Sequence, residues 1–232
     1  MPLPLSYQNS PDLAFTHLVA AVQTCRRCPR MEGRTRVLGP ASGPLAARLL
    51  FVAEAPGRLG ADRSGVPLTG DRAGQTFEAL LEAGGIERRA VFVTNAVLCN
   101  PRDAAGRNDR PTGREVANCG DHLARLIEIV QPEWVVTLGA VALAALGRIA
   151  PHALILARDV GRPIPWHGRR LVPLYHPGPR ALIRRPLSMQ RTDYQRLAAL
   201  VAGQADAAGR APVCVTPGQE GGNHAGRVLA RR

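Results

Sequence analysis

The chain has 232 residues, and all 30 of its basic residues are arginine, which gives a formal net charge of +12. This length suffices for one full hydrophobic core, and the lack of lysine excludes covalent chemistry through a lysine Schiff base. The charge favours a polyanionic partner such as nucleic acid, although an arginine-rich codon bias would give the same excess.

Nothing in the sequence predicts a membrane protein. No apolar run reaches the roughly 18 residues that a membrane helix requires. The first residues, MPLPL, lack the charged and apolar regions of a signal peptide. We therefore expect a cytoplasmic protein with reduced thiols, in which spaced cysteines predict metal binding before disulfides.

Helices and strands are predicted in alternation along the chain. In order they are a helix over 10–24, a strand over 48–53, a helix over 73–83, a strand over 90–98, a helix over 112–130, a strand over 133–138, a helix over 140–146, a strand over 170–175 and a helix over 188–201. Ser10 is the predicted N-cap of the first helix, and Thr112 and Glu115 form a capping box. A minor strand is expected near 154–157.

Continuous apolar strands that alternate with helices predict an α/β fold with a parallel sheet covered on both faces. We expect one catalytic domain over 1–202. Residues 203–232 are rich in glycine and alanine with few apolar anchors, and are predicted to be a disordered tail in which Cys214 has no role.

Polar residues follow three of the predicted strands. Glu54 comes directly after the first strand, Asn95 lies near the end of the second, and His176 follows the last. Each alone is better explained as a cap, a turn former or a strand exit. Because functional groups of parallel sheets lie beyond the carboxyl ends of the strands, the coincidence of all three indicates a site.

Four cysteines are spaced as metal ligands often are. Cys25 and Cys28 form a close pair, whereas Cys99 and Cys119 lie far along the chain. Spacing alone fits either a zinc ion held by four thiolates or an iron–sulfur cluster.

Several motifs together resemble those of the uracil-DNA glycosylase superfamily. They are 54–57 (EAPG), 65–70 (GVPLTG), 94–101 (TNAVLCNP) and 176–178 (HPG). The four cysteines narrow the resemblance to the iron–sulfur branch, families four and five, and it spans about residues 20–200. The resemblance implies a four-stranded parallel sheet flanked by helices and a [4Fe–4S] cluster on Cys25, Cys28, Cys99 and Cys119.

The resemblance also implies an activity: hydrolysis of the N-glycosidic bond of a deoxyuridine flipped out of single- or double-stranded DNA, by a monomer. Asn95 would pair with the O4 and N3–H of uracil, because an amide offers both a donor and an acceptor. His176 would donate near O2 to the departing uracil anion. Glu54 and Asp71 compete for the role of positioning the attacking water.

The motifs mix the two families. Gly57 and Leu68 are assigned to the substrate pocket, but family four has an aromatic ring at the position of Leu68. Asp71 matches the acidic residue of family five, whereas Asn95 favours family four. Two alternatives therefore stay open: a glycosylase with a broader range of deaminated bases such as hypoxanthine and xanthine, or a non-catalytic iron–sulfur protein that binds DNA.

DNA contacts are predicted just after His176. Arg180 or Leu182 would enter the base stack, and Arg184 and Arg185 would hold phosphates. The same segment is also explained as the solvated start of a helix. A second possible phosphate-binding set, or merely a solvated loop, lies between Cys99 and Cys119: Arg102, Arg107 and Arg110.

Overall fold

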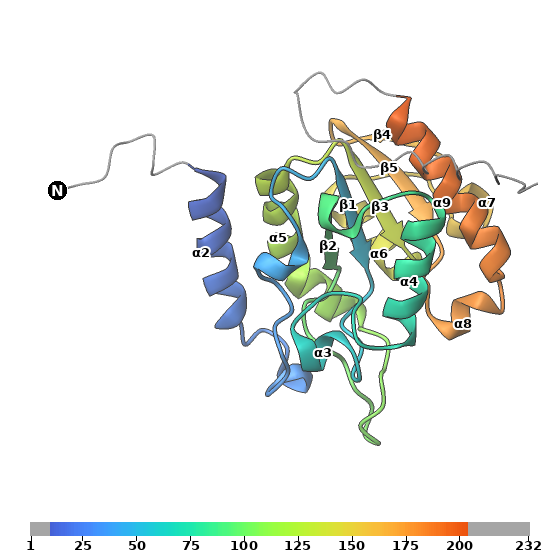
Figure 1. Ribbon diagram of the computed structural model, residues 1–232. Helices are drawn as coiled ribbons and strands as arrows, with labels where there is room; N and C mark the ends of the chain where they lie inside the picture. The colour runs from blue at the N-terminus through green and yellow to red at the C-terminus, as the bar shows by residue number, and fades with distance from the viewer. Residues whose placement is uncertain (1–9, 204–232) are drawn as a thin grey trace, which may run out of the picture.

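Five strands form one sheet in the computed structural model, which describes residues 10–203 (Figure 1). The strands are β1 (Leu49–Ala53), β2 (Val91–Asn95), β3 (Trp134–Leu138), β4 (Ile164–Trp166) and β5 (Arg169–Leu174), in the order β2-β1-β3-β5-β4. The four predicted strands are confirmed and run parallel, but β4 adds an antiparallel edge to β5. The predicted tail, with Cys214, lies outside the described residues.

Two predictions about the strands are wrong. The sheet has five strands rather than four. The minor strand expected near 154–157 is not formed, because residues 156 and 157 begin the short helix α7 (Leu156–Asp159). Strand β4 contains Pro165, which is tolerated because an edge strand leaves one row of backbone groups unpaired. His167 and Gly168 both have positive φ (48° and 72°), as a two-residue hairpin turn of type I′ requires.

The longer helices agree closely with the sequence patterns. They are α2 (Pro11–Gln23), α4 (Arg72–Ala83), α5 (Gly113–Val130), α6 (Ala140–Ile149) and α9 (Leu187–Ala202). Ser10 Oγ accepts the N–H of Leu13 at 3.2 Å, and the capping box of Thr112 and Glu115 is present in both directions. None of the described helices has the length and apolar character needed to cross a membrane.

Alternate strand residues face two separate hydrophobic cores. One core packs Leu50, Val52 and Phe92 against α2, α5 and α6, and the other packs Phe51, Ala53 and Val93 against α4 and α9. Asn95 follows Val93 by two residues and therefore belongs to the face that α4 covers.

The loops after the parallel strands gather at one edge of the sheet, at the bottom of Figure 1. The short helices α3 (Ala61–Ser64) and α8 (Pro179–Leu182) and the loop between β2 and α5 lie there. This is the edge at which sites in parallel sheets are expected.

Candidate active site at the carboxyl edge of the sheet

Glu54 and Asn95 stand at the ends of two neighbouring strands. Ala53 is the register partner of Asn95, so Glu54 follows directly beside it, and the Glu54 carbonyl accepts the N–H of Val97 at 3.1 Å. The Asn95 residue is only 2% exposed. Its Nδ2 is buried and has no hydrogen-bond partner among the described residues. Because native proteins rarely bury an unpaired amide, this donor is a candidate for binding a ligand.

Asp71 is brought to the same edge as the N-cap of α4. Its Oδ1 accepts the N–H of Gly74 at 3.0 Å. The other oxygen lies against two glycines of the loop after β1. A Cβ atom added to Gly57 would be 2.3 Å from Asp71 Oδ2, and one added to Gly60 would be 2.7 Å from it. Gly57 therefore allows the carboxylate to approach, while the predicted contact of Gly57 with substrate stays a prediction.

His176 is held as a neutral donor. Its Nδ1 accepts the backbone N–H of Gly178 at 2.9 Å, which leaves the proton of the neutral ring on Nε2. Burial lowers the pKa of His176 to about 4, and the Asp71 carboxylate only partly opposes this effect. The Asp71 charge therefore acts on His176, although the two residues are far apart in the sequence.

Two arginines act on Glu54. Burial raises the pKa of the half-buried Glu54 carboxyl, while the charges of Arg110 and Arg180 lower it. The sequence predicted Arg180 only as a DNA contact and Arg110 only as a phosphate ligand, so their proximity to Glu54 is new. No sequence signal could have found it, because the three residues come from different loops.

Leu68 has an unusual backbone for a residue with a large side chain. Its φ is 49°, in the left-handed region, and it is 9% exposed within the core under α4. Such a conformation costs about 1–2 kcal/mol in a residue other than glycine. Its carbonyl lies so close to α4 that a Cβ atom added to Gly74 would be 2.6 Å from it. Backbone strain of this kind often accompanies a functional loop.

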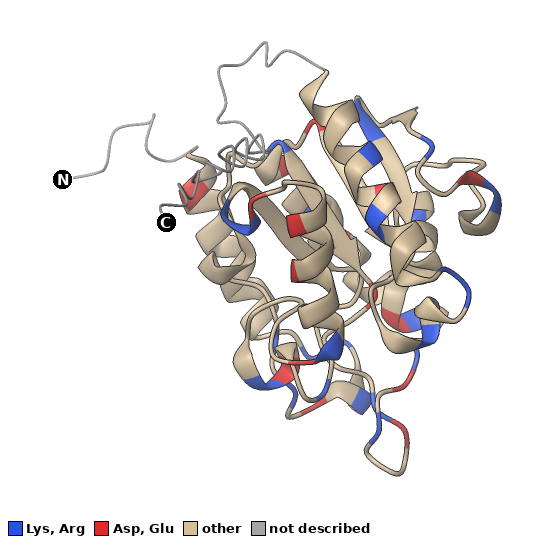
Figure 2. Ribbon diagram, turned by 45° about the vertical axis from the view of Figure 1, so that its right-hand side comes forward, with Lys and Arg blue, Asp and Glu red and all other residues tan. Residues whose placement is uncertain are grey.

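The predicted DNA-contacting segment separates into exposed and anchored residues. Arg180 and Arg184 are exposed and Leu182 is partly buried. Arg185 makes a bidentate ion pair with Asp193, with N–O distances of 2.5 and 2.6 Å, so its predicted phosphate contact competes with a structural role. Ile183, for which the sequence predicted no role, is 84% exposed directly after α8. Arginines lie on the loops at this edge (Figure 2).

Two of the three arginines in the second set pair with acidic side chains. Arg102 pairs with the buried Asp62 at 2.6 Å, and Arg107 pairs with Asp103 at 2.8 Å. These ion pairs brace the loop between β2 and α5, whereas the Arg110 side chain acts on Glu54.

All four predicted cysteine ligands line one pocket. None of these cysteines is in a disulfide, and the pocket is completed by Arg27, Met31, Arg36 and Asn118. Burial, with a smaller contribution from the neighbouring thiols of the set, raises the pKa of Cys99 to about 12 and that of Cys119 to about 11. Within residues 10–203, however, no group of three or more His, Cys, Asp or Glu side chains is arranged to hold a metal ion.

The sequence matches a known family over most of the domain. Residues 40–198 match the model of the uracil DNA glycosylase superfamily. The chain belongs to this superfamily. A type-4 uracil-DNA glycosylase from Thermotoga maritima is 37% identical over 157 residues, covering 67% of this chain and 77% of the relative. A type-5 enzyme from Pyrobaculum aerophilum is 31% identical over 203 residues, covering 75% and 87%.

Matches to both types of uracil-DNA glycosylase confirm the mixed motifs of the sequence. Another type-5 relative, from Thermus thermophilus, is 31% identical over 200 residues and covers 68% of this chain and 84% of its own length.

Proposed function

We propose that this chain is a uracil-DNA glycosylase that acts as a monomer on DNA containing uracil. It hydrolyses the N-glycosidic bond of a flipped-out deoxyuridine and leaves an abasic site. The observation that carries the proposal is the buried Asn95 amide, whose donor has no partner among the described residues. The similarity to type-4 and type-5 enzymes supports the same reaction.

The residues of the site suit this reaction. Asn95 would donate from Nδ2 to uracil O4 and accept the N3–H at Oδ1, a pattern that cytosine does not offer. The base leaves as an anion, so the neutral Nε2–H of His176 would stabilise negative charge at O2. The strained Leu68 on the same face would pack against the base, in the place where family four has an aromatic ring.

Glu54 is the better candidate for positioning the attacking water. Asp71 uses one carboxylate oxygen to cap α4, and the other lies against two glycines. Glu54 caps no helix, and burial raises its pKa toward the range in which a carboxylate accepts a proton well. Asp71 would then supply negative charge near the cationic sugar.

Isosteric substitutions of the two carboxylates test this assignment. Glu54→Gln should lower the rate of uracil release by roughly 10²- to 10⁴-fold, the usual contribution of a general base. Asp71→Asn should cost less, because asparagine is as good an N-cap as aspartate and only the charge is lost. The measurement is alkali cleavage of single- and double-stranded uracil oligonucleotides. A larger loss of rate in Asp71→Asn than in Glu54→Gln would assign the positioning of the water to Asp71 instead.

A substrate panel separates the proposed function from its alternatives. Wild-type protein is tested on uracil, hypoxanthine and xanthine in matched oligonucleotides. Release of uracil alone supports the proposal, and release of all three indicates the broader glycosylase. DNA binding with no release of any base favours a non-catalytic protein.

We infer that the four cysteines hold a [4Fe–4S] cluster. Their chemistry fits, because four thiols without disulfides line one pocket. Cys25, Cys28, Cys99 and Cys119 would hold the cluster through their thiolates. When bound, the cluster would serve as a structural cross-link between the N-terminal segment, the end of β2 and α5.

Removal of one thiol should release the metal. Cys99→Ala is expected to lose iron and visible absorption and to unfold at lower temperature, because metal binding contributes directly to folding. Cys214→Ala, which changes the cysteine outside the proposed set, is the control and should keep full iron. Metal analysis of anaerobically purified protein is the measurement, and a colourless wild type with one zinc per chain would contradict the assignment.

A further inference from the structure

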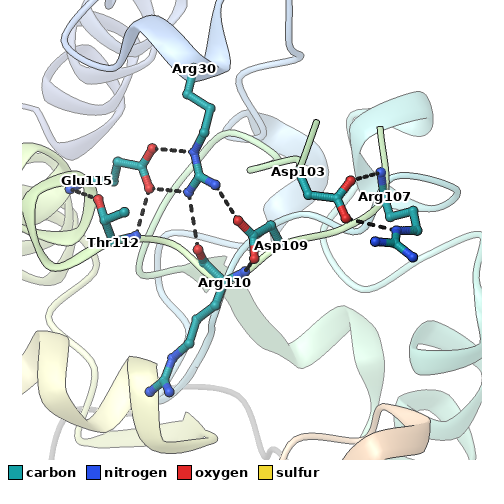
Figure 3. Close-up of polar contacts among 7 residues, drawn as sticks. All are labelled: Arg30, Asp103, Arg107, Asp109, Arg110, Thr112 and Glu115. Carbon is teal, nitrogen blue, oxygen red and sulfur yellow. Dashed lines mark hydrogen bonds and ion pairs between the residues drawn. The ribbon is translucent and has the colours of Figure 1, made fainter. Parts of the chain in front are cut away.

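Arg30 donates to three different groups: the Glu115 carboxylate, the Asp109 carboxylate and the backbone carbonyl of Arg110 (Figure 3). Its Nε and Nη2 bind the two carboxylate oxygens of Glu115 at 2.9 and 2.6 Å. Its Nη1 binds Asp109 at 2.5 Å, and Nη2 also reaches the backbone carbonyl of Arg110 at 3.1 Å. A planar guanidinium is suited to such a fork, which lysine could not reproduce.

These contacts connect parts of the chain that are distant in sequence. Arg30 lies two residues after Cys28, and Glu115 lies four residues before Cys119 in the capping box of α5. The side chains of Arg30 and Glu115 are only 31% and 10% exposed, so solvent screens this pair less than a surface ion pair. Arg30, in the cysteine-bearing segment, therefore fixes the backbone at Asp109 and Arg110, which we call the corner of this loop.

The Arg110 side chain leaves this corner in the opposite direction. Figure 3 shows it extending away from Arg30, while its backbone carbonyl faces the Arg30 guanidinium. The backbone N–H of Arg110 donates to Asp109 at 2.8 Å, so its backbone is held on both sides. The loop that carries Arg110 lies against the loop after Glu54: Asn108 Oδ1 accepts the backbone N–H of Arg58 at 2.9 Å, and Asn100 Nδ2 donates to the Pro56 carbonyl at 2.7 Å. Burial raises the pKa of the Glu54 carboxyl, whereas the charges of Arg110 and Arg180 lower it.

We propose that Arg30 is a positioning residue that holds Arg110 toward Glu54 and so joins the cysteine-bearing segment to the active site. This inference rests on the catalytic role proposed for Glu54. Arg30 touches neither Glu54 nor substrate and acts only through the corner that it fixes. Arg110 is exposed, so loss of the Arg30 contacts would let its side chain move away from Glu54. A half-buried carboxylate without its cation would hold a proton more strongly.

The test measures the pKa of Glu54 directly, by carbon-13 NMR titration with the Glu54→Gln variant to assign the signal. Arg30→Met and Arg110→Met should each shift this pKa upward, and the acid limb of the pH–rate profile should move the same way. The double variant should shift it no further than Arg110→Met alone, because Arg30 acts through Arg110. Visible absorption and iron content of each variant show whether the cysteine site is intact.

Two further variants separate positioning from a general loss of charge. Arg107→Met removes a guanidinium from the same loop, where it pairs with Asp103, and should leave the Glu54 pKa unchanged. Asp109→Ala loosens the corner without changing Arg30, and it should shift the Glu54 pKa upward. Loss of the Asp109 charge alone would shift the Glu54 pKa downward, so the direction of the shift separates the two effects. This variant also decides the matter if Arg30→Met does not fold.

An unchanged Glu54 pKa in Arg30→Met or in Arg110→Met would overturn the proposal. A double variant whose shift equals the sum of the single shifts would also overturn it, because the two arginines would then act independently. Failure of the wild type to release uracil would instead reject the proposed function. The NMR titration would still report whether Arg30 controls the environment of Glu54.

Discussion

Replacing Asn95 with alanine should remove nearly all uracil release and leave the folded protein at least as stable as the wild type. The reason is the buried Nδ2, which has no partner among the described residues and so costs desolvation free energy in the unbound protein. Uracil would satisfy this donor, and its loss should lower kcat/KM by roughly 10²- to 10³-fold, as for the loss of a preorganised donor. The measurements are uracil release and urea unfolding on the same preparations.

Asn100 provides the matched control, because it is another asparagine buried near the end of β2. Its amide is fully used: Nδ2 donates to the Pro56 carbonyl at 2.7 Å and to Asn108 at 3.0 Å, and Oδ1 accepts from Arg102 at 2.7 Å. Asn100→Ala should therefore destabilise the fold by about 1–3 kcal/mol. If Asn95→Ala is destabilised to the same extent, or keeps wild-type activity, Asn95 is a structural residue.

Most of the fold could be predicted because local signals agreed with the global pattern. The apolar runs predicted all four parallel strands, and Ser10 and Thr112 predicted the starts of two helices to within one residue. Strand β4 could not be predicted in this way. It has three residues, one of them proline, and is recognisable only from its pairing with β5 across a tight turn.

The site could be predicted to the extent that it depends on strand ends. Parallel strands end at one edge, so Glu54, Asn95 and His176 were expected together, and the structure places all three at that edge. The electrostatic effect of Arg110 on Glu54 depends on loop conformation, which no periodicity in the sequence encodes. The exposure of Ile183 likewise depends on the single turn of α8, after which its side chain is left in solvent.

His176 should contribute to the reaction as a neutral donor rather than as a cation. Its ring accepts from Gly178 at Nδ1, and its pKa is lowered to about 4 by burial, so the imidazole is uncharged at neutral pH. His176→Ala should lower kcat by roughly 10²- to 10³-fold at pH 7. His176→Gln should retain more activity, because its amide can still donate. A wild-type rate that falls as pH rises through about 6.5 would contradict this, since it would require the protonated ring.

The same shift predicts how stability depends on pH. The unfolded chain binds a proton at the ordinary pKa of 6.5, whereas the folded protein resists it until about pH 4. Stability should therefore fall as pH falls between these values, because the unfolded state gains the proton first. In urea unfolding, the His176→Gln variant should lose less stability than the wild type as pH falls over this range.

His122 is the control, because burial also lowers its pKa. His122→Gln should likewise lose less stability as pH falls, while its rate of uracil release stays unchanged. Loss of uracil release in His122→Gln as well as in His176→Ala would indicate damage to the fold, whereas loss in His176→Ala alone supports a donor at the departing base.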